Sequence, residues 1–275
     1  GMDLEEWYHL DYINKISKQN SEYSMLDGFS NFLDITESNN IKSTIFTVAN
    51  IAHKLKKDLE WANSNLYEIA SHGLTHKRPL TLSKEEFKYE IRQSKLILED
   101  IIQNNIMGFR APCFSINSEL IDLLIENNYA YDSSKIDFKL HPLYGNFTLN
   151  DFINVQENIY VKNSFVEFEI PTIKILNKNI PFSGGGYLRL FPLKIIIYFI
   201  KQMSILNKPI FFYIHPFELS DREIPTLNLN FKNQFRMKVG RKQIKEKLDK
   251  IIKFLLKNNW KIITFKEYYE TIIKK

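Results

Sequence analysis

Residues 67–76, YEIASHGLTH, decide the fold of this chain, because a short apolar segment runs directly into two histidines. We predict a strand over Tyr67 to Ala70. Upstream, Ser43 to Ala49 reads STIFTVA, and its β-branched and aromatic residues predict a second buried strand. A helix predicted over Ile51 to Asn63 connects the two. Strand, helix and strand in this order predict parallel strands joined by a right-handed crossover.

The same alternation continues downstream of the histidines. Ser83 and Glu86 have the spacing of a capping box, which predicts the start of a helix that extends to about Ile102. The next two predicted elements are a strand over Met107 to Arg110 and a helix that Asn117 can cap and that ends near Asn127.

The middle of the chain is less regular than its ends. From Lys139 to about Leu190, turn residues alternate with strands such as Ser164 to Ile170, which predicts a hairpin-rich insertion. The remaining predicted elements are a helix over Leu190 to Ile205, a strand over Pro209 to Ile214, a helix over Arg236 to Asn258, a strand over Lys261 to Phe265 and a last helix over Lys266 to Ile273. We therefore predict one α/β domain over residues 1–275, built as a barrel or an open twisted sheet.

The composition is that of an ordinary globular protein. The 275 residues include 37 basic and 32 acidic side chains, for a net charge of +5, and 44% are apolar. Lysines between Lys242 and Lys253 alternate with apolar residues at helical spacing, which favours a solvated helix face over a nucleic-acid surface. We predict no nucleic-acid partner.

The compartment is predicted from cysteine content and apolar runs. Cys113 is the only cysteine, and the first residues are acidic rather than of signal-peptide type. No apolar run approaches the ~20 residues that a membrane-spanning helix needs. We expect a cytoplasmic protein with no membrane span, and the pattern leaves the oligomeric state open.

Polar residues gather where predicted strands end. In parallel α/β proteins the carboxyl ends of the strands share one face, and functional sites form there. The residues in such positions are Asp3, Glu5, His72, His76, Arg110, Asp132 and His215. Their placement predicts one functional site assembled from separate segments.

His72 and His76 have His-x3-His spacing, which brings two imidazoles to one side of a helical turn or a tight loop. Together with a carboxylate they would leave coordination positions open, as catalytic metals require. Two surface histidines are the alternative. Asp3 and Glu5 lie two residues apart and share one side of an extended segment, although a solvated acidic terminus would look the same.

Seven stretches, in this order, resemble the polysaccharide deacetylases of the NodB-homology superfamily (carbohydrate esterase family 4-like), and most closely the branch found in exopolysaccharide and O-antigen gene clusters. They cover nearly the whole chain, which makes the set specific. The stretches are MDLEEWYH (Met2–His9), EIASHGLTH (Glu68–His76), GFRAPCF (Gly108–Phe114), YDSS (Tyr131–Ser134), HPLYG (His141–Gly145), GGGYLR (Gly184–Arg189) and FYIHPFE (Phe212–Glu218).

The resemblance implies a distorted (β/α)7 barrel with one divalent metal, zinc being favoured and Co²⁺, Ni²⁺, Fe²⁺ or Mn²⁺ the alternatives. It implies that an N-acetylated carbohydrate is the substrate and that the protein is a hydrolase of linear amide bonds. Position by position, it implies Glu5, His72 and His76 as metal ligands, Asp3 as catalytic base, Arg110 as the residue that holds the base, His215 as catalytic acid and Asp132 as the carboxylate that orients this acid.

Weaker assignments concern the sugar cleft and the surroundings of the metal. His141, Tyr187 and Arg189 are candidate substrate-binding residues, although turn chemistry explains the glycines before Tyr187 equally well. Glu6 and His9 are candidates for supporting the site. Cys113 and Phe114 depart from the tyrosine that many members of the family carry after the proline. The backbone N–H at this position could still bind the oxyanion.

Three functions are weighed. The first is an N-deacetylase acting on a polysaccharide or on its lipid-linked or nucleotide-linked precursor in the cytoplasm. The second is a metal amidohydrolase for a small non-sugar amide, and the third is a catalytically inactive carbohydrate-binding homologue. Because only Gly1 and Met2 precede Asp3, we also expect a truncated first strand, an unpaired sheet edge beside it, and Asp3 and Glu5 more mobile than the histidines.

Overall fold

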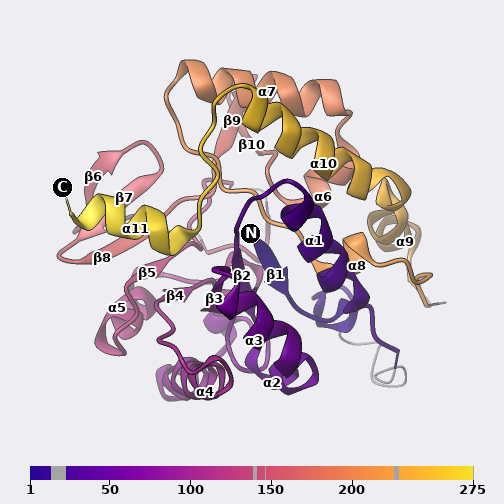
Figure 1. Cartoon of the computed structure of the whole chain (residues 1–275). Helices are drawn as coiled ribbons and strands as arrows, with labels where there is room; N and C mark the ends of the chain where they lie inside the picture. Colours follow the sequence, from indigo (N-terminus) through magenta and orange to yellow (C-terminus); the bar gives the residue numbers. More distant parts are fainter. Residues whose placement is uncertain (14–22, 139–140, 146, 226–228, 275) are drawn as a thin grey trace.

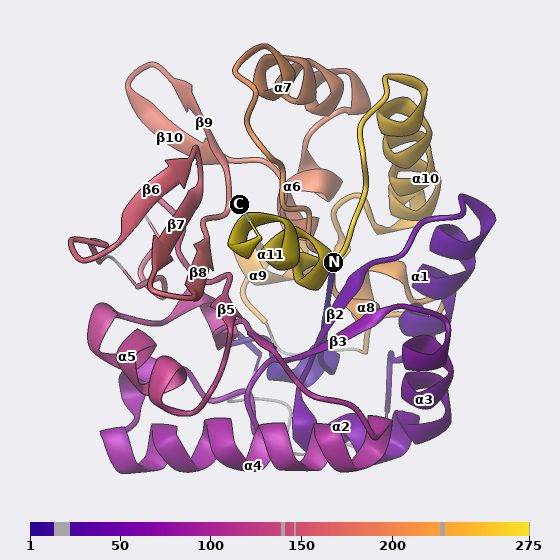
Figure 2. The same ribbon diagram turned by 60° about the vertical axis from the view of Figure 1, so that its left-hand side comes forward.

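A computed structural model describes residues 1–13, 23–138, 141–145, 147–225 and 229–274, and shows a mainly parallel sheet curled into a barrel inside a ring of helices (Figures 1 and 2). The sheet order is β1-β2-β3-β4-β5-β8-β7-β6, and β1 to β5 and β8 pair in parallel. The strands of this sheet are β1 (Met2–Leu4), β2 (Thr44–Thr47), β3 (Glu68–Ser71), β4 (Gly108–Phe109), β5 (Tyr131–Asp132), β6 (Ile153–Gln156), β7 (Ile159–Lys162) and β8 (Phe165–Phe168).

Helices surround these strands, and α11 lies across one end of the barrel (Figure 2). The α-helices are α1 (Asp27–Ser38), α2 (Ala49–Ala52), α3 (Lys56–Ser64), α4 (Lys84–Ile102), α5 (Ser118–Glu126), α6 (Gly185–Leu190), α7 (Leu193–Ile205), α8 (Pro216–Leu219), α9 (Phe231–Lys238), α10 (Arg241–Lys257) and α11 (Phe265–Ile273). Short 3₁₀ helices cover Trp7–His9, His53–Leu55, Pro79–Thr81 and Pro112–Phe114. The predicted α/β barrel class is confirmed.

Helix capping confirms two predicted starts. The Ser83 side chain accepts the N–H of Glu86, and the Glu86 side chain accepts the N–H of Ser83, so α4 begins with the predicted capping box. Asn117 caps α5 by accepting the N–H of Leu120. These local signals are reliable because each one depends on residues only three positions apart.

The predicted helix over Ile51 to Asn63 is two helices, whereas the predicted helices over Leu190 to Ile205 and Arg236 to Asn258 correspond mainly to α7 and α10, each of which follows a shorter helix. A 3₁₀ turn at His53–Leu55 separates α2 from α3. Pro192 separates α6 from α7, because proline lacks an N–H and disfavours a helical residue before it. Gly240 separates α9 from α10 with a left-handed φ of +66°, and a Cβ there would collide with the Arg189 carbonyl.

The predicted strands Pro209 to Ile214 and Lys261 to Phe265 are not ladder strands. The first makes single parallel bridges, Met2 to Ile214 and Gly184 to Tyr213, and so closes the barrel beside β1. The second is irregular backbone that leads into α11.

The unpaired edge expected beside the first strand is absent from the described residues. Strand β1 has only three residues, yet it pairs with β2 on one side and with Ile214 on the other. The Asp3 N–H donates to the Ile214 carbonyl over 2.9 Å, and the Ile214 N–H donates to the Gly1 carbonyl over 3.3 Å. The segment that the prediction treated as a separate strand therefore covers this edge.

Two antiparallel hairpins lie between β5 and α6. Strands β6 and β7 form the first and continue into β8, whereas β9 (Thr172–Ile175) and β10 (Lys178–Pro181) form a separate two-stranded sheet. We predicted one domain with an insertion at about 139–190, and this division of the chain stays a prediction. Residues 139–140 lie outside the described residues.

The core fills the barrel and the space beneath the helices. The end crossed by α11 is closed by aromatic packing, in which Phe265 stacks on Phe211 and on Tyr131. The N–H of Lys266 donates to Glu68, so a buried carboxylate ties β3 to the first turn of α11. In the part of the chain that the structure describes, no helix combines the length and the apolar character needed to cross a membrane.

Candidate active site

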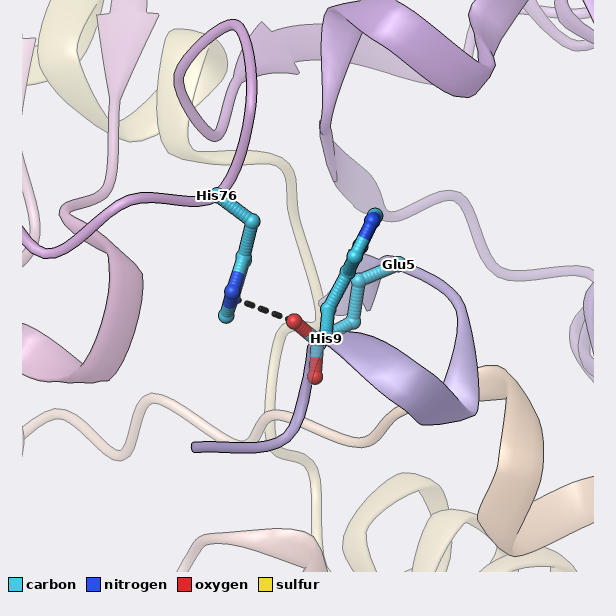
Figure 3. Close-up of side chains that lie close together, drawn as sticks. All are labelled: Glu5, His9 and His76. Atoms are coloured by element: carbon cyan, nitrogen blue, oxygen red, sulfur yellow. Dashed lines mark ion pairs between the residues drawn. The ribbon is translucent and has the colours of Figure 1, made fainter. Parts of the chain in front are cut away.

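Glu5, His9 and His76 lie close together (Figure 3), where the chain continues beyond the carboxyl ends of β1 and β3. Glu5 follows β1, His9 ends the 3₁₀ turn after it, and His76 lies in the loop after β3. One ligand atom from each of the three lies within 4.8 Å of the others, and Glu5 forms an ion pair with His76 Nε2. All three side chains are buried. The structure therefore brings together two of the three predicted ligands, Glu5 and His76.

His72, the third predicted ligand, lies next to this group rather than in it. Its ring centroid is 5.1 Å from that of His76, and its Nδ1 is 2.7 Å from the Arg110 carbonyl oxygen. A carbonyl can only accept, so His72 Nδ1 carries the proton and Nε2 keeps its lone pair. Burial lowers the pKa of His72 to about 4, which keeps the ring neutral.

His9 was assigned only a supporting role by the sequence, yet it lies in the group. Its Nδ1 accepts the backbone N–H of Glu6 over 3.4 Å, which places the proton of a neutral ring on Nε2. Burial lowers the pKa of His9 to about 4. The position of His9 four residues after Glu5, within a tight turn, was the signal that could have placed it here.

The donor set fits a divalent metal. Glu5 Oε2 is buried, and its partner among the described residues is His76 Nε2, with which it forms the ion pair. Burial would raise the pKa of Glu5, but the nearby His76 outweighs it and lowers the pKa to about 2, so the carboxylate is ionised. One carboxylate oxygen beside imidazole nitrogens is a donor set typical of zinc and similar metals.

Glu90, on α4, shapes the loop that carries His76. Its carboxylate accepts the N–H groups of Leu74 and Thr75, at 3.1 and 2.9 Å, and the Thr75 hydroxyl. These bonds hold the loop where His76 adopts a left-handed φ of +60°. Such a backbone conformation is costly for a non-glycine residue and persists where its surroundings fix it.

Asp3 and Arg110 form a buried ion pair. Arg110 Nη1 donates to Asp3 Oδ1 over 2.7 Å, and its other nitrogens donate to the carbonyl and hydroxyl of Ser133. The guanidinium lies 4.0 Å from the Phe46 ring centroid. Burial would raise the pKa of Asp3, but Arg110 and nearby histidines lower it, so Asp3 is ionised.

His215 is held by Glu218, three residues along the chain. His215 Nδ1 is 3.0 Å from Glu218 Oε2, and its Nε2 is 3.9 Å from Glu5 Oε1. Burial would lower the pKa of His215, but the hydrogen bond and charge of Glu218 raise it to about 9. Glu218 was not among the predicted site residues, although its i+3 spacing from His215 is visible in the sequence.

Arg189 lies behind this pair and does not line a cleft as predicted. Its Nε donates to Glu218 Oε1 over 2.6 Å, and its Nη1 donates to the carbonyls of Arg236 and Val239. The side chain is buried. Arg189 is therefore occupied in fixing the carboxylate that holds His215.

Asp132 was predicted to orient His215, and this role is wrong because Glu218 occupies the Nδ1 side of that imidazole. Asp132 Oδ1 instead accepts the Ser134 hydroxyl over 2.7 Å, and this hydroxyl accepts the N–H of Ala111. Asp132 thus supports the backbone next to Arg110 rather than the acid. Glu167 on β8 is its other neighbour, and the two carboxyl groups are both buried.

His141 and Tyr187 remain candidates for contact with substrate. His141 is partly exposed and stacks on Tyr144 with 4.0 Å between ring centroids, and Tyr144 in turn contacts Phe114. Tyr187, on α6, is partly exposed and stacks on Phe191. Cys113, in the 3₁₀ turn before Phe114, has a left-handed φ of +54°.

Comparison with known families agrees with the sequence motifs. Residues 23–131 match the family described as Polysaccharide deacetylase, and residues 133–269 match the family described as Domain of unknown function (DUF3473). Residues 23–131 therefore carry the polysaccharide deacetylase domain that the motifs predicted. No protein with a curated description matches it.

Solved structures share the fold at low sequence identity. A protein from Mycobacterium smegmatis described as a polysaccharide deacetylase aligns over 99% of this chain and 88% of its own, with 14% identity and a TM-score of 0.65. PuuE allantoinase aligns over 88% of this chain and 71% of its own, with 14% identity and a TM-score of 0.56. A Bacillus anthracis protein described as a CE4 family pseudoenzyme aligns over 98% and 63%, with 11% identity and a TM-score of 0.53. The fold thus occurs with and without enzymatic activity.

Proposed function

We propose that this protein is a metal-dependent hydrolase that removes an N-acetyl group from an amino sugar, in a lipid-linked or nucleotide-linked precursor of a polysaccharide. The observation that carries the proposal is the buried, ionised Glu5 carboxylate that converges with histidine nitrogens, with a second carboxylate and a further histidine in the same site. A binding protein without catalytic activity has no need for this arrangement.

We assign the metal to Glu5, His72 and His76. The hydrogen bond of His72 to a carbonyl leaves its Nε2 free to coordinate, which is the usual arrangement of a histidine ligand. His9 accepts a backbone N–H at Nδ1, so its Nε2 is a proton donor and His9 is better suited to contacting substrate or water.

A divalent metal bound here would lower the pKa of a water molecule and polarise the amide carbonyl of the substrate. Asp3 then has the position and the charge to accept the proton of the attacking water. Arg110 keeps Asp3 ionised and fixes the oxygen that it contacts, which leaves the other oxygen for the proton.

His215 supplies the second proton transfer. An amine leaves poorly as an anion, so its nitrogen needs a proton as the amide bond breaks. Glu218 holds His215 at Nδ1, leaving Nε2 as the donor, and Arg189 holds Glu218 in turn. The proposed base, Asp3, therefore lies in β1, and the proposed acid, His215, directly follows the segment whose Ile214 pairs with β1.

The test is acetate release by the metal-loaded protein from N-acetylhexosamine oligomers, nucleotide-linked N-acetyl sugars and lipid-linked N-acetyl sugars. Allantoin serves as the small non-sugar amide, and its ring opening is followed as allantoate formation. Acetate from a sugar, lost in Asp3→Asn and in His215→Ala, is expected. Losing a general acid or base costs a rate factor of ~10² to 10⁴. Hydrolysis of allantoin alone would show that the substrate is a small non-sugar amide. Sugar binding without turnover by the metal-loaded protein would show that the chain is an inactive carbohydrate-binding homologue.

A further inference from the structure

The segment from Ile170 to Phe217 contains no acidic residue, although the whole chain has 32. Its six basic residues are Lys174, Lys178, Arg189, Lys194, Lys201 and Lys208. Arg189 is bound to Glu218, and Lys208 pairs with Glu157 over 3.2 Å. The other four lysines are exposed and, within the described ranges, form no ion pair. The segment therefore contributes four exposed lysines that form no ion pair among the described residues, and no acidic residue of its own.

Helix α7 places two of these lysines in a row with apolar residues. Lys194, Tyr198, Lys201 and Ile205 follow one another at spacings of four, three and four residues, so they share one helix face. Tyr198 is 57% exposed and Ile205 is 76% exposed. The opposite face, which includes Phe199 and Met203, is buried against the body of the protein. The outer face is thus apolar and basic rather than polar.

The β9–β10 hairpin extends this surface. Ile173 of β9 packs against the core cluster that Phe199 and Met203 of α7 form with Phe182, and the hairpin lies beside α7 in both views (Figures 1 and 2). Leu176, in the turn of the hairpin, is 93% exposed, and Lys174 and Lys178 flank it. We call this surface the basic apolar face. It consists of Lys174, Ile175, Leu176, Lys178, Lys194, Ile195, Tyr198, Lys201, Ile205 and Leu206.

Charge decides between the possible occupants of this face. A second copy in a two-fold dimer would place the same patch against itself, so lysines would meet lysines with no acidic residue of the patch to pair with them. Nucleic acid suits the charge, but it does not explain exposed aliphatic residues such as Leu176 and Ile205. An anionic lipid surface explains both, because apolar side chains and tyrosine enter the headgroup region while lysines contact the anionic headgroups.

We propose that the basic apolar face binds the surface of an anionic phospholipid bilayer, with the hairpin turn and the outer face of α7 lying in the headgroup region. The helix lies on the membrane and does not cross it. This inference goes beyond the proposed enzymatic function and is independent of it, because none of the residues of the face belongs to the candidate active site.

The test is co-sedimentation of the full chain with vesicles of phosphatidylcholine alone and with vesicles that also contain phosphatidylglycerol. Binding is expected to be at least tenfold tighter to the anionic vesicles and to weaken as salt is added. Leu176→Ser with Ile205→Ser should weaken binding at least tenfold, and Lys194→Glu with Lys201→Glu should remove the preference for anionic lipid.

Matched controls carry the same changes on other exposed positions. Tyr89→Ser with Leu96→Ser, on α4, removes exposed apolar side chains, and Lys57→Glu with Lys257→Glu makes the same change in net charge. All variants replace exposed residues, and thermal melting verifies that they fold. The proposal fails if neither vesicle is bound, if both are bound equally, or if the controls weaken binding as much. It also fails if the face variants instead abolish a concentration-dependent dimer or nucleic-acid binding.

Discussion

Arg110 is the residue that connects the most parts of the site. It binds Asp3, which lies 107 residues away in the sequence, and it donates hydrogen bonds to Ser133. Its guanidinium group lies over the Phe46 ring. A buried charge of this kind is stable only because its donors are satisfied. Removing one partner of such a pair typically costs about 3–5 kcal/mol, so Arg110 serves both folding and the proposed chemistry.

The role of Glu218 in holding His215 can be tested by a single substitution. Glu218→Gln removes the charge beside His215 Nδ1 while keeping the shape of the side chain. Loss of a group that orients a functional histidine typically costs a factor of ~10 to 100 in activity. We expect kcat to fall by about that factor with KM nearly unchanged, measured by acetate release. Glu246→Gln, an exposed change on α10, is the control. A wild-type kcat would show that Glu218 does not position the acid.

At the scale of elements, β5 and β8 are joined by two buried carboxyl groups. Glu167 Oε1 accepts the N–H groups of Ser134 and Lys135, while Asp132 Oδ2 and Glu167 Oε2 have no other partner among the described residues. Two adjacent buried carboxylates cannot both be ionised at low cost, so they share a proton. Burial, followed by the charge of Asp132, raises the pKa of Glu167 well above its usual value, and burial raises that of Asp132 to about 6.

This pair predicts how stability depends on pH. Raised pKa values in the folded state mean that the folded protein binds more protons than the unfolded chain, so the free energy of unfolding falls as pH rises above about 4. Glu167→Gln keeps the backbone acceptor and can donate to Asp132. We expect its Tm to exceed that of the wild type by an amount that grows from pH 5 to pH 8. Glu223→Gln, which is exposed, should show no such trend. A Tm difference that does not change with pH would mean that the pair is not protonated.

At the scale of the whole molecule, the proposed metal joins segments that close the barrel. Glu5 follows β1, whereas His72 and His76 follow β3 on the other side of β2. A ligand that binds only the folded state stabilises it by RT ln(1 + [L]/Kd), about 2.7 kcal/mol at 100 times Kd. Metal binding should therefore be visible as global stability.

We expect Zn²⁺ or Co²⁺ to raise Tm by about 5–10 °C at 100 times Kd, and a chelator to reverse the rise. His72→Ala and His76→Ala should abolish both the rise and the stoichiometric metal, measured by melting and elemental analysis. His9→Ala should retain the metal, and so should His53→Ala, which removes an exposed histidine. If His9→Ala loses the metal and His72→Ala retains it, then His9 is the metal ligand and His72 is not.

The sequence by itself determined the α/β class, the capped starts of α4 and α5, and most of the residues that line the site. These features depend on local spacing: Ser83 reaches Glu86, and polar residues follow apolar strands, whatever the rest of the chain does. The family motifs added the order of the segments. The starts of α7 and α10 were less predictable, because Pro192 and Gly240 separate each of them from a shorter helix that precedes it.

Only the tertiary structure decided which side chains meet. Closure of the barrel places Ile214 against β1, and so covers the edge that the short first strand was expected to leave open. It also turns Arg189 inward behind Glu218 and brings His9 and Glu5 to His76. Such pairings depend on strand register and on the direction of each side chain at the end of its strand. Neither is written in the hydrophobic pattern, because that pattern records which residues are buried and not which buried residues touch.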